Sequence, residues 1–268
     1  MKVVVNADDF GSTERHTRLI VKLLLSKKIS STTFLVNLPY SEEAAKILRE
    51  SHPELKDRVG LHFNLIEGKP LNPSLLHSPF VDSQQQLKDF RGRVSIFNQL
   101  WHIRKLVTEL NLQIHRFHLL TGTYPSHIDS HGHTHCTLVM LLALLLAKNA
   151  GKVEAIRLSR QYDHEPGHLA GAKNRLRRFA KQLLNLGFRM RFHTVAYFTD
   201  IRNIDGSWLT SQQLRVMASK FKSVEIMCHP YMFDESEFDF LSLTPNVLEA
   251  TQGIELVSYA ELKQDQKH

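Results

Sequence analysis

Short runs of apolar residues alternate with longer amphipathic stretches along the chain. The short runs are rich in Val, Ile and Phe and are bounded by polar or Gly positions, which is typical of buried strands. Strands are expected at residues 3–7, 33–37, 59–65, 127–130, 155–158, 194–198, 224–228 and 254–257. The longer stretches repeat apolar residues at three- and four-residue spacing, which indicates helices. Helices are expected at residues 12–28, 41–50, 97–120, 137–149, 176–186, 211–220 and 259–264.

This alternation of strands and helices predicts an α/β fold with a parallel sheet. So many strands in 268 residues favour a closed or nearly closed variant (β/α) barrel, formed as a single domain over residues 1–268. A doubly wound open sheet is the alternative. Residues 67–95 and 159–171 lack clear periodicity. We expect them to be irregular insertions over the catalytic face, acting as lids or substrate walls.

The composition excludes several classes of protein. An apolar fraction of 42% with 12 Gly and 9 Pro excludes an intrinsically disordered chain. Cys136 and Cys228 are too few for a disulfide framework, and we interpret both as small core residues. The longest apolar run, residues 138–147, is too short to span a membrane, and no signal-peptide pattern follows Met1. We therefore expect a cytoplasmic protein with no membrane partner.

The net charge of +7 permits nucleic-acid binding, but the basic residues are scattered along the chain. The densest basic stretch, residues 173–181, carries Leu176, Phe179 and Ala180 at helical spacing, which favours an amphipathic surface helix. We expect no nucleic-acid partner, and a homo-oligomer is compatible with this composition. The unusual count is 16 His, several of them in one short segment.

Residues able to do chemistry collect within the predicted strands and at the positions that follow them. Because the carboxyl ends of parallel strands meet at one edge, where α/β barrels hold their active sites, we expect these side chains to converge. They are Asp8, Asp9, His62, Asp129, His131, Arg157, Asp200 and His229.

The first cluster is residues 6–11, Asn-Ala-Asp-Asp-Phe-Gly. Two adjacent carboxylates at a strand end point in different directions, so one can bind a cation while the other accepts a proton. The alternative is that Asp9 only caps the following helix, a common use of Asp.

The second cluster is residues 127–135, which hold four His and one Asp. Alternation along a strand delivers several imidazoles to one small volume. Imidazole nitrogen and carboxylate oxygen are ligands of zinc and similar metals, so the segment predicts a divalent metal site. A hydrogen-bonded polar loop is the alternative. Some of His127, Asp129, His133 and His135 would then orient the ligands or line a substrate groove.

Two further imidazoles stand alone in the sequence. His62 lies in an apolar strand, where it is either a buried core residue or the remaining metal ligand. His229 precedes Pro230, so the backbone there is extended. An imidazole at that strand end is either a general acid or a turn residue.

Taken together, these segments resemble the YdjC-like carbohydrate deacetylases, which include the bacterial chitooligosaccharide deacetylases. The resemblance runs in order over nearly the whole chain, and residues 6–11 and 127–135 are its most specific parts. The chain departs from the family pattern near His16, after His229 and over residues 67–95. These departures affect the substrate rather than the metal chemistry.

The resemblance implies a variant barrel of the glycoside hydrolase and deacetylase type. It implies a metal-dependent hydrolase that removes N-acetyl groups from amino sugars or short N-acetylated oligosaccharides, so the expected partner is a small carbohydrate. By this resemblance Asp9, His62 and His131 are the ligands of a divalent metal. The family is usually described with Mg²⁺, whereas two imidazoles and one carboxylate suit Zn²⁺ or another transition metal at least as well.

By the same resemblance Asp8 is the catalytic base, His229 is the general acid and Arg157 orients Asp8. Other functions remain as alternatives. A metal-dependent phosphoesterase or amidohydrolase is one, because His-x-His pairs such as residues 131–133 recur in those classes. A carbohydrate-binding protein without catalysis is another, and nucleic-acid binding rests on the charge alone.

Overall fold

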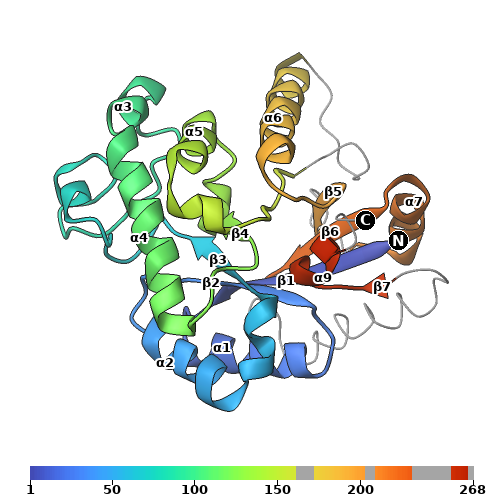
Figure 1. Ribbon diagram of the computed structural model, residues 1–268. Helices are drawn as coiled ribbons and strands as arrows, with labels where there is room; N and C mark the ends of the chain where they lie inside the picture. The colour runs from blue at the N-terminus through green and yellow to red at the C-terminus, as the bar shows by residue number, and fades with distance from the viewer. Residues whose placement is uncertain (161–171, 203–208, 231–254, 265–268) are drawn as a thin grey trace.

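The computed structural model describes residues 1–160, 172–202, 209–230 and 255–264 (Figure 1). The strands of its sheet are β1 (Lys2–Phe10), β2 (Ser31–Phe34), β3 (Val59–Phe63), β4 (Ile128–Ser130), β5 (Tyr197–Asp200), β6 (Ser223–Cys228) and β7 (Glu255–Leu256). The α-helices are α1 (Glu14–Leu25), α2 (Ser41–Lys46), α3 (Ile96–Trp101), α4 (Ile103–Thr121), α5 (Leu138–Leu146), α6 (Ala172–Arg191), α7 (Ser211–Lys220) and α9 (Tyr259–Gln264).

The sheet is parallel and follows the order β4-β3-β2-β1-β6-β5, with β7 paired to the start of β1. The strands β1 to β4 therefore lie side by side in sequence order, and β6 pairs with β1 on the side opposite β2. Figure 1 shows the helices arranged around the outside of this curled sheet. A doubly wound sheet instead reverses its strand order at a central switch point.

The segment expected to form a fifth strand closes the gap between β4 and β5. It forms two isolated parallel bridges, Ile156 with Ile128 and Ala155 with His193. The amide of Ile128 donates to the carbonyl of Ala155, and the amide of Ile156 donates to the carbonyl of His193, both at 3.0 Å. The predicted variant barrel is confirmed. Between β4 and β5, however, single bridges take the place of a full strand.

The central strand β1 is apolar because both of its faces are covered. Val3, Val4 and Val5 are fully buried, as expected of a strand inside a parallel sheet. β1 pairs in register with β6 from Lys2 to Ala7. On its other side the register with β2 shifts between Ala7 and Phe10, which marks an irregularity at the end that carries the two predicted carboxylates.

Several helices differ in extent from their predictions. The helix expected at 97–120 is divided into α3 and α4 at His102, whose ring Nδ1 lies 2.9 Å from the carbonyl of Asn98. A side chain that bonds to a backbone carbonyl competes with continuation of the helix. α2 passes into a π-helical turn, Ile47–Ser51, and α6 is longer than expected.

The first expected insertion, residues 67–95, is irregular but packed. It contains a 3-10 turn, Pro73–His77, and an antiparallel bridge between Val81 and Leu87. Phe80 and Phe90 are buried within it, with ring centroids 5.1 Å apart. Of the second insertion, residues 161–171 lie outside the described residues. In the part of the chain that the structure describes, no helix has the length and apolarity to cross a membrane.

Candidate metal centre

Three predicted ligands from different strands meet at the carboxyl end of the sheet. Asp9 lies at the end of β1, His62 lies in β3 and His131 follows β4 directly. Oδ1 of Asp9 is 3.2 Å from Nε2 of His62 and 3.0 Å from Nδ1 of His131. One ligand atom from each residue lies within 4.8 Å of the others. The structure therefore brings together the three side chains predicted to bind a metal.

The surroundings of His62 fit a bound cation. Its Nε2 atom is buried and has no hydrogen-bond partner, although it faces the Asp9 carboxylate. An orphaned buried nitrogen is costly in a protein interior, and coordination of a metal would satisfy it. The two imidazoles and one carboxylate are a donor set that zinc and other transition metals accept.

The opposite nitrogen of His62 is held by Asp129. Nδ1 of His62 lies 2.6 Å from Oδ1 of Asp129, and Oγ1 of Thr33 donates to the other carboxylate oxygen at 3.0 Å. A carboxylate on the far nitrogen fixes the tautomer and the orientation of a metal-binding imidazole. Asp129, whose role the sequence left open, takes this position.

A backbone irregularity turns both carboxylates of β1 into the site. Asp9 has a φ of 69°, a left-handed conformation that is uncommon for residues other than glycine. As a result, Oδ2 of Asp8 and Oδ2 of Asp9 lie 3.8 and 3.9 Å from Nε2 of His229. Simple strand alternation would have directed them to opposite faces. The capping interpretation of Asp9 is wrong, because Thr13 caps α1.

Asp8 is held by a fully buried arginine. The Nη1 and Nη2 atoms of Arg157 donate to the two oxygens of Asp8 at 2.8 and 2.7 Å, and Nη1 also lies 2.6 Å from Oδ2 of Asp129. Burial by itself would raise the pKa of Asp8, but the charge and hydrogen bonds of Arg157, together with the nearby His62 and His229, outweigh it and hold that pKa below its usual range. Asp8 is therefore an ionised carboxylate in a fixed orientation, beside the three-ligand group.

Two residues to which the sequence assigned no role complete this network. Nε of Arg157 donates to Oε1 of Glu225 at 2.7 Å, and the Tyr259 hydroxyl donates to Oε2 of Glu225. Burial raises the pKa of Glu225 to about 7, although Arg157 opposes the shift. The signal in the sequence was a lone carboxylate within the apolar strand β6.

The 67–95 insertion reaches the site from the solvent side. Oε1 of Glu67 lies 3.3 Å from Nε2 of His131, and the Glu67 side chain is 49% exposed. Arg91 donates to the carbonyl of Gly132. Gly132 has a φ of +58°, and a Cβ there would lie 2.4 Å from a methyl group of Ile66. The insertion therefore contacts the loop that presents His131.

The other imidazoles of residues 127–135 lie next to this centre but outside the ligand group, with His127 and His135 buried and His133 half-buried. Burial lowers the pKa of His127, His133 and His135, in the case of His133 to about 3. They are therefore neutral near pH 7. His127 stacks on Tyr259 with ring centroids 4.0 Å apart, and Nδ1 of His135 lies 2.6 Å from Oγ of Ser130.

The structure also places the other residues that the sequence singled out, namely the two cysteines and Asp200. Cys228 is buried and fits a core residue, whereas Cys136 is only partly buried. Its surroundings nevertheless raise the pKa of the Cys136 thiol to about 12. Asp200, at the end of β5, lies 3.5 Å from Nη1 of Arg160.

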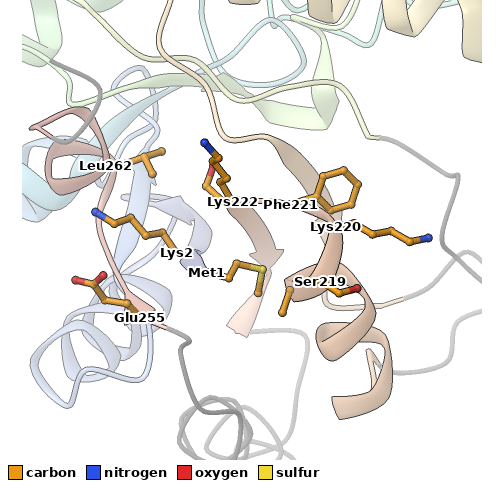
Figure 2. A pocket seen from close by; sticks show the side chains of 10 residues that line it. Met1, Lys2, Ser219, Lys220, Phe221, Lys222, Glu255 and Leu262 are labelled. Carbon is orange, nitrogen blue, oxygen red and sulfur yellow. The ribbon is translucent and has the colours of Figure 1, made fainter. Parts of the chain in front are cut away.

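A separate hollow of about 690 Å³ lies at the amino ends of β1 and β6, between Lys2 and Phe221 (Figure 2). None of the predicted site residues lines it.

Comparison with known proteins identifies the family of the chain. A family model described as YdjC-like protein matches residues 2–262. The chain belongs to the YdjC-like protein family. The resemblance seen in the sequence is thereby confirmed.

Relatives with a functional name align with this YdjC-like chain over most of their length. A carbohydrate deacetylase of Vibrio cholerae serotype O1 is 29% identical over 240 residues, which cover 87% of this chain and 80% of the relative. A chitooligosaccharide deacetylase of Klebsiella pneumoniae subsp. pneumoniae is 30% identical over 234 residues, which cover 87% of this chain and 82% of the relative.

A solved structure shares the fold. It is a protein of Enterococcus faecalis V583 to which cleavage of cellobiose phosphate has been ascribed. The two superpose with a TM-score of 0.70 at 24% identity, covering 97% of this chain and 98% of the other. This likeness bears on the fold of the YdjC-like chain and not on its substrate.

Proposed function

We propose that this protein is a metal-dependent carbohydrate N-deacetylase, a hydrolase that removes acetyl groups from amino sugars or short N-acetylated oligosaccharides. One observation carries the proposal: Asp9, His62 and His131 converge beside Asp8, a second carboxylate that Arg157 holds in place. The names of the relatives from Vibrio cholerae and Klebsiella pneumoniae support the same substrate class.

In this proposal the metal is held by Asp9, His62 and His131. A divalent cation there supplies Lewis-acid chemistry, drawing charge from the acetyl carbonyl and making water more acidic. The nitrogen-rich donor set favours Zn²⁺ or another transition metal over Mg²⁺, which prefers oxygen ligands. One cation per chain is expected, because Arg157 already occupies the space between Asp8 and Asp129.

Asp8 is proposed as the general base. Hydrolysis of an amide requires a group that takes the proton of the attacking water as the new C–O bond forms. Asp8 remains ionised at neutral pH, because Arg157 holds its pKa low, and the bidentate contact fixes the direction in which its oxygens point. It lies on the same side of the site as His229.

His229 is proposed as the general acid. Cleavage of the C–N bond leaves the sugar nitrogen with an electron pair, and that amine departs readily only if it receives a proton. The His229 side chain is 24% exposed and its Nε2 faces both Asp8 and Asp9. It therefore meets the carboxylates on one side and solvent, from which the substrate arrives, on the other.

The deciding experiment measures acetate release from N-acetylglucosamine and from N-acetylated oligosaccharides of increasing length. The protein is stripped with a chelator and reloaded with Zn²⁺, Co²⁺ or Mg²⁺ in parallel. We expect activity only after reloading, and neither metal binding nor activity in Asp9→Ala or His131→Ala. Absence of acetate release from every sugar with every metal would refute the deacetylase proposal. Two metal ions per chain with hydrolysis of phosphate esters would instead favour a phosphoesterase.

A further inference from the structure

A buried chain of hydrogen bonds connects the start of α9 to the proposed base. The Tyr259 hydroxyl donates to Oε2 of Glu225, Nε of Arg157 donates to Oε1 of Glu225 at 2.7 Å, and the Nη atoms of Arg157 donate to Asp8. Tyr259, Glu225 and Arg157 are each no more than 1% exposed. Neither Glu225 nor Tyr259 can therefore touch a substrate, and neither belongs to the ligand group.

The contacts of Arg157 with Asp8, Asp129 and Glu225 restrict the orientation of its guanidinium group in different ways. Its Nη atoms face Asp8 and Asp129, while its remaining edge, at Nε, faces Glu225. A guanidinium is a rigid plane, so three acceptors on two edges determine how that plane is turned. Phe198 lies against the guanidinium, with Cζ 5.2 Å from its ring centroid. The direction of the Asp8 carboxylate follows from the orientation of this plane.

Glu225 is itself fixed by an aromatic pair. Its second oxygen accepts from Tyr259, whose ring stacks on His127 at a centroid distance of 4.0 Å and an interplanar angle of 15°. Both oxygens of Glu225 therefore have donors. Stability alone gives little reason to bury a third carboxylate against Arg157, because buried ion pairs are often no more stable than well-packed apolar side chains.

We propose that Glu225, held by Tyr259, is a positioning residue of the proposed deacetylase: it fixes the plane of Arg157 and thereby aims the Asp8 carboxylate at the attacking water. This inference rests on the proposed function. It goes further in assigning a part of the reaction to β6 and α9, two elements that contribute no ligand and no base. Loss of Glu225 or of its tyrosine contact then lowers turnover without weakening substrate or metal binding.

The test uses three substitutions in the metal-loaded full chain. Tyr259→Phe removes one hydroxyl and keeps the ring, Glu225→Gln keeps an acceptor for Arg157 Nε, and Glu225→Ala removes it. Outer partners of catalytic groups typically contribute about 10- to 100-fold in activity. We expect kcat to fall by about 10-fold in Tyr259→Phe and by about 100-fold in Glu225→Ala, with Glu225→Gln between them. KM and metal content should stay unchanged.

Glu109→Gln is the matched control. Glu109 is a fully buried carboxylate on α4 that accepts hydrogen bonds from the amides of Leu71 and Asn72 and from Gln113. This substitution should lower the melting temperature and leave kcat unchanged. If Tyr259→Phe and Glu225→Gln also lose only thermal stability, the positioning role is wrong. Should Glu225→Ala not fold, these two milder variants decide the matter.

A measurement that needs no activity separates this inference from the proposed function. In ¹⁵N-labelled protein, hydrogen exchange of the Arg157 Nε–H reports directly on its contact with Glu225. We expect slow exchange in the wild type and an acceleration of at least about 10-fold in Tyr259→Phe, since loosening a buried contact exposes the proton. Unchanged exchange would overturn the positioning role. Accelerated exchange in a protein that releases no acetate would refute the deacetylase proposal and leave the Glu225 contact established.

Discussion

Nδ1 of His62 lies 2.6 Å from Oδ1 of Asp129, and both side chains are removed from solvent. Water therefore has no access to replace this contact if it is lost. The contact leaves Nε2 of His62 as the nitrogen that faces Asp9. Asp129 thus determines which imidazole atom is offered to a cation, although it is not itself one of the three proposed ligands.

This contact predicts the behaviour of Asp129→Asn. An amide can present a donor instead of an acceptor to His62, so the imidazole loses its fixed tautomer. Removal of such outer partners typically weakens metal binding by about 10- to 100-fold. We expect a loss of this size in Zn²⁺ affinity, measured by competition with a chromogenic chelator. Glu109→Gln serves again as the control, and an unchanged affinity in Asp129→Asn would show that Asp129 does not orient the ligand.

Asp8→Asn separates proton transfer from metal binding. Asn is the same size as Asp but cannot accept the proton of water, and Asp8 is not among the three ligands. General-base catalysis typically contributes about 10²- to 10⁴-fold. We expect a loss of kcat in this range with full metal occupancy, measured by acetate release and elemental analysis on one preparation. Wild-type turnover in Asp8→Asn would rule out this residue as the base.

His229→Gln tests the general acid through the leaving group. An amine needs a proton in order to depart, whereas the phenolate released from a p-nitrophenyl acetate ester does not. We expect the variant to lose about 10²- to 10⁴-fold in activity on the N-acetyl sugar and to retain most of its activity on the ester. Equal losses on the two substrates would contradict proton donation and indicate a role in binding instead.

His127 makes stability depend on pH. Burial holds its pKa well below that of a free histidine, so below about pH 6.5 the unfolded chain takes up a proton that the folded chain does not. The free energy of unfolding therefore falls as the pH drops through this window, by about 1.4 kcal/mol per pH unit for one proton. In His127→Gln we expect a smaller slope between about pH 6.5 and 5, measured by urea denaturation in the presence of a chelator. A slope equal to that of the wild type would argue against a buried neutral His127.

Much of the fold and the proposed ligand set could be predicted from local sequence. β1 contains three consecutive valines and β6 is largely apolar, because both faces of a parallel strand are covered, and such runs can be recognised from the residues alone. The His and Asp residues of 127–135 are similarly conspicuous. The break between α3 and α4 was missed, because it depends on one side-chain hydrogen bond of His102, and amphipathic spacing continues across it.

The amino-acid sequence alone determined the parallel α/β class and placed reactive side chains at strand ends, because periodicity and residue type are local properties. Tertiary structure decided which of them meet. The left-handed backbone at Asp9 turns two consecutive carboxylates into one site. Folding also places His131 beside Asp9 and His62, while His127, His133 and His135 pack next to this group. The same holds for Glu225 and Tyr259, whose contacts join residues separated by 34 positions in the chain. Distances across a sheet depend on register, curvature and burial, and none of these is encoded in a single stretch of residues.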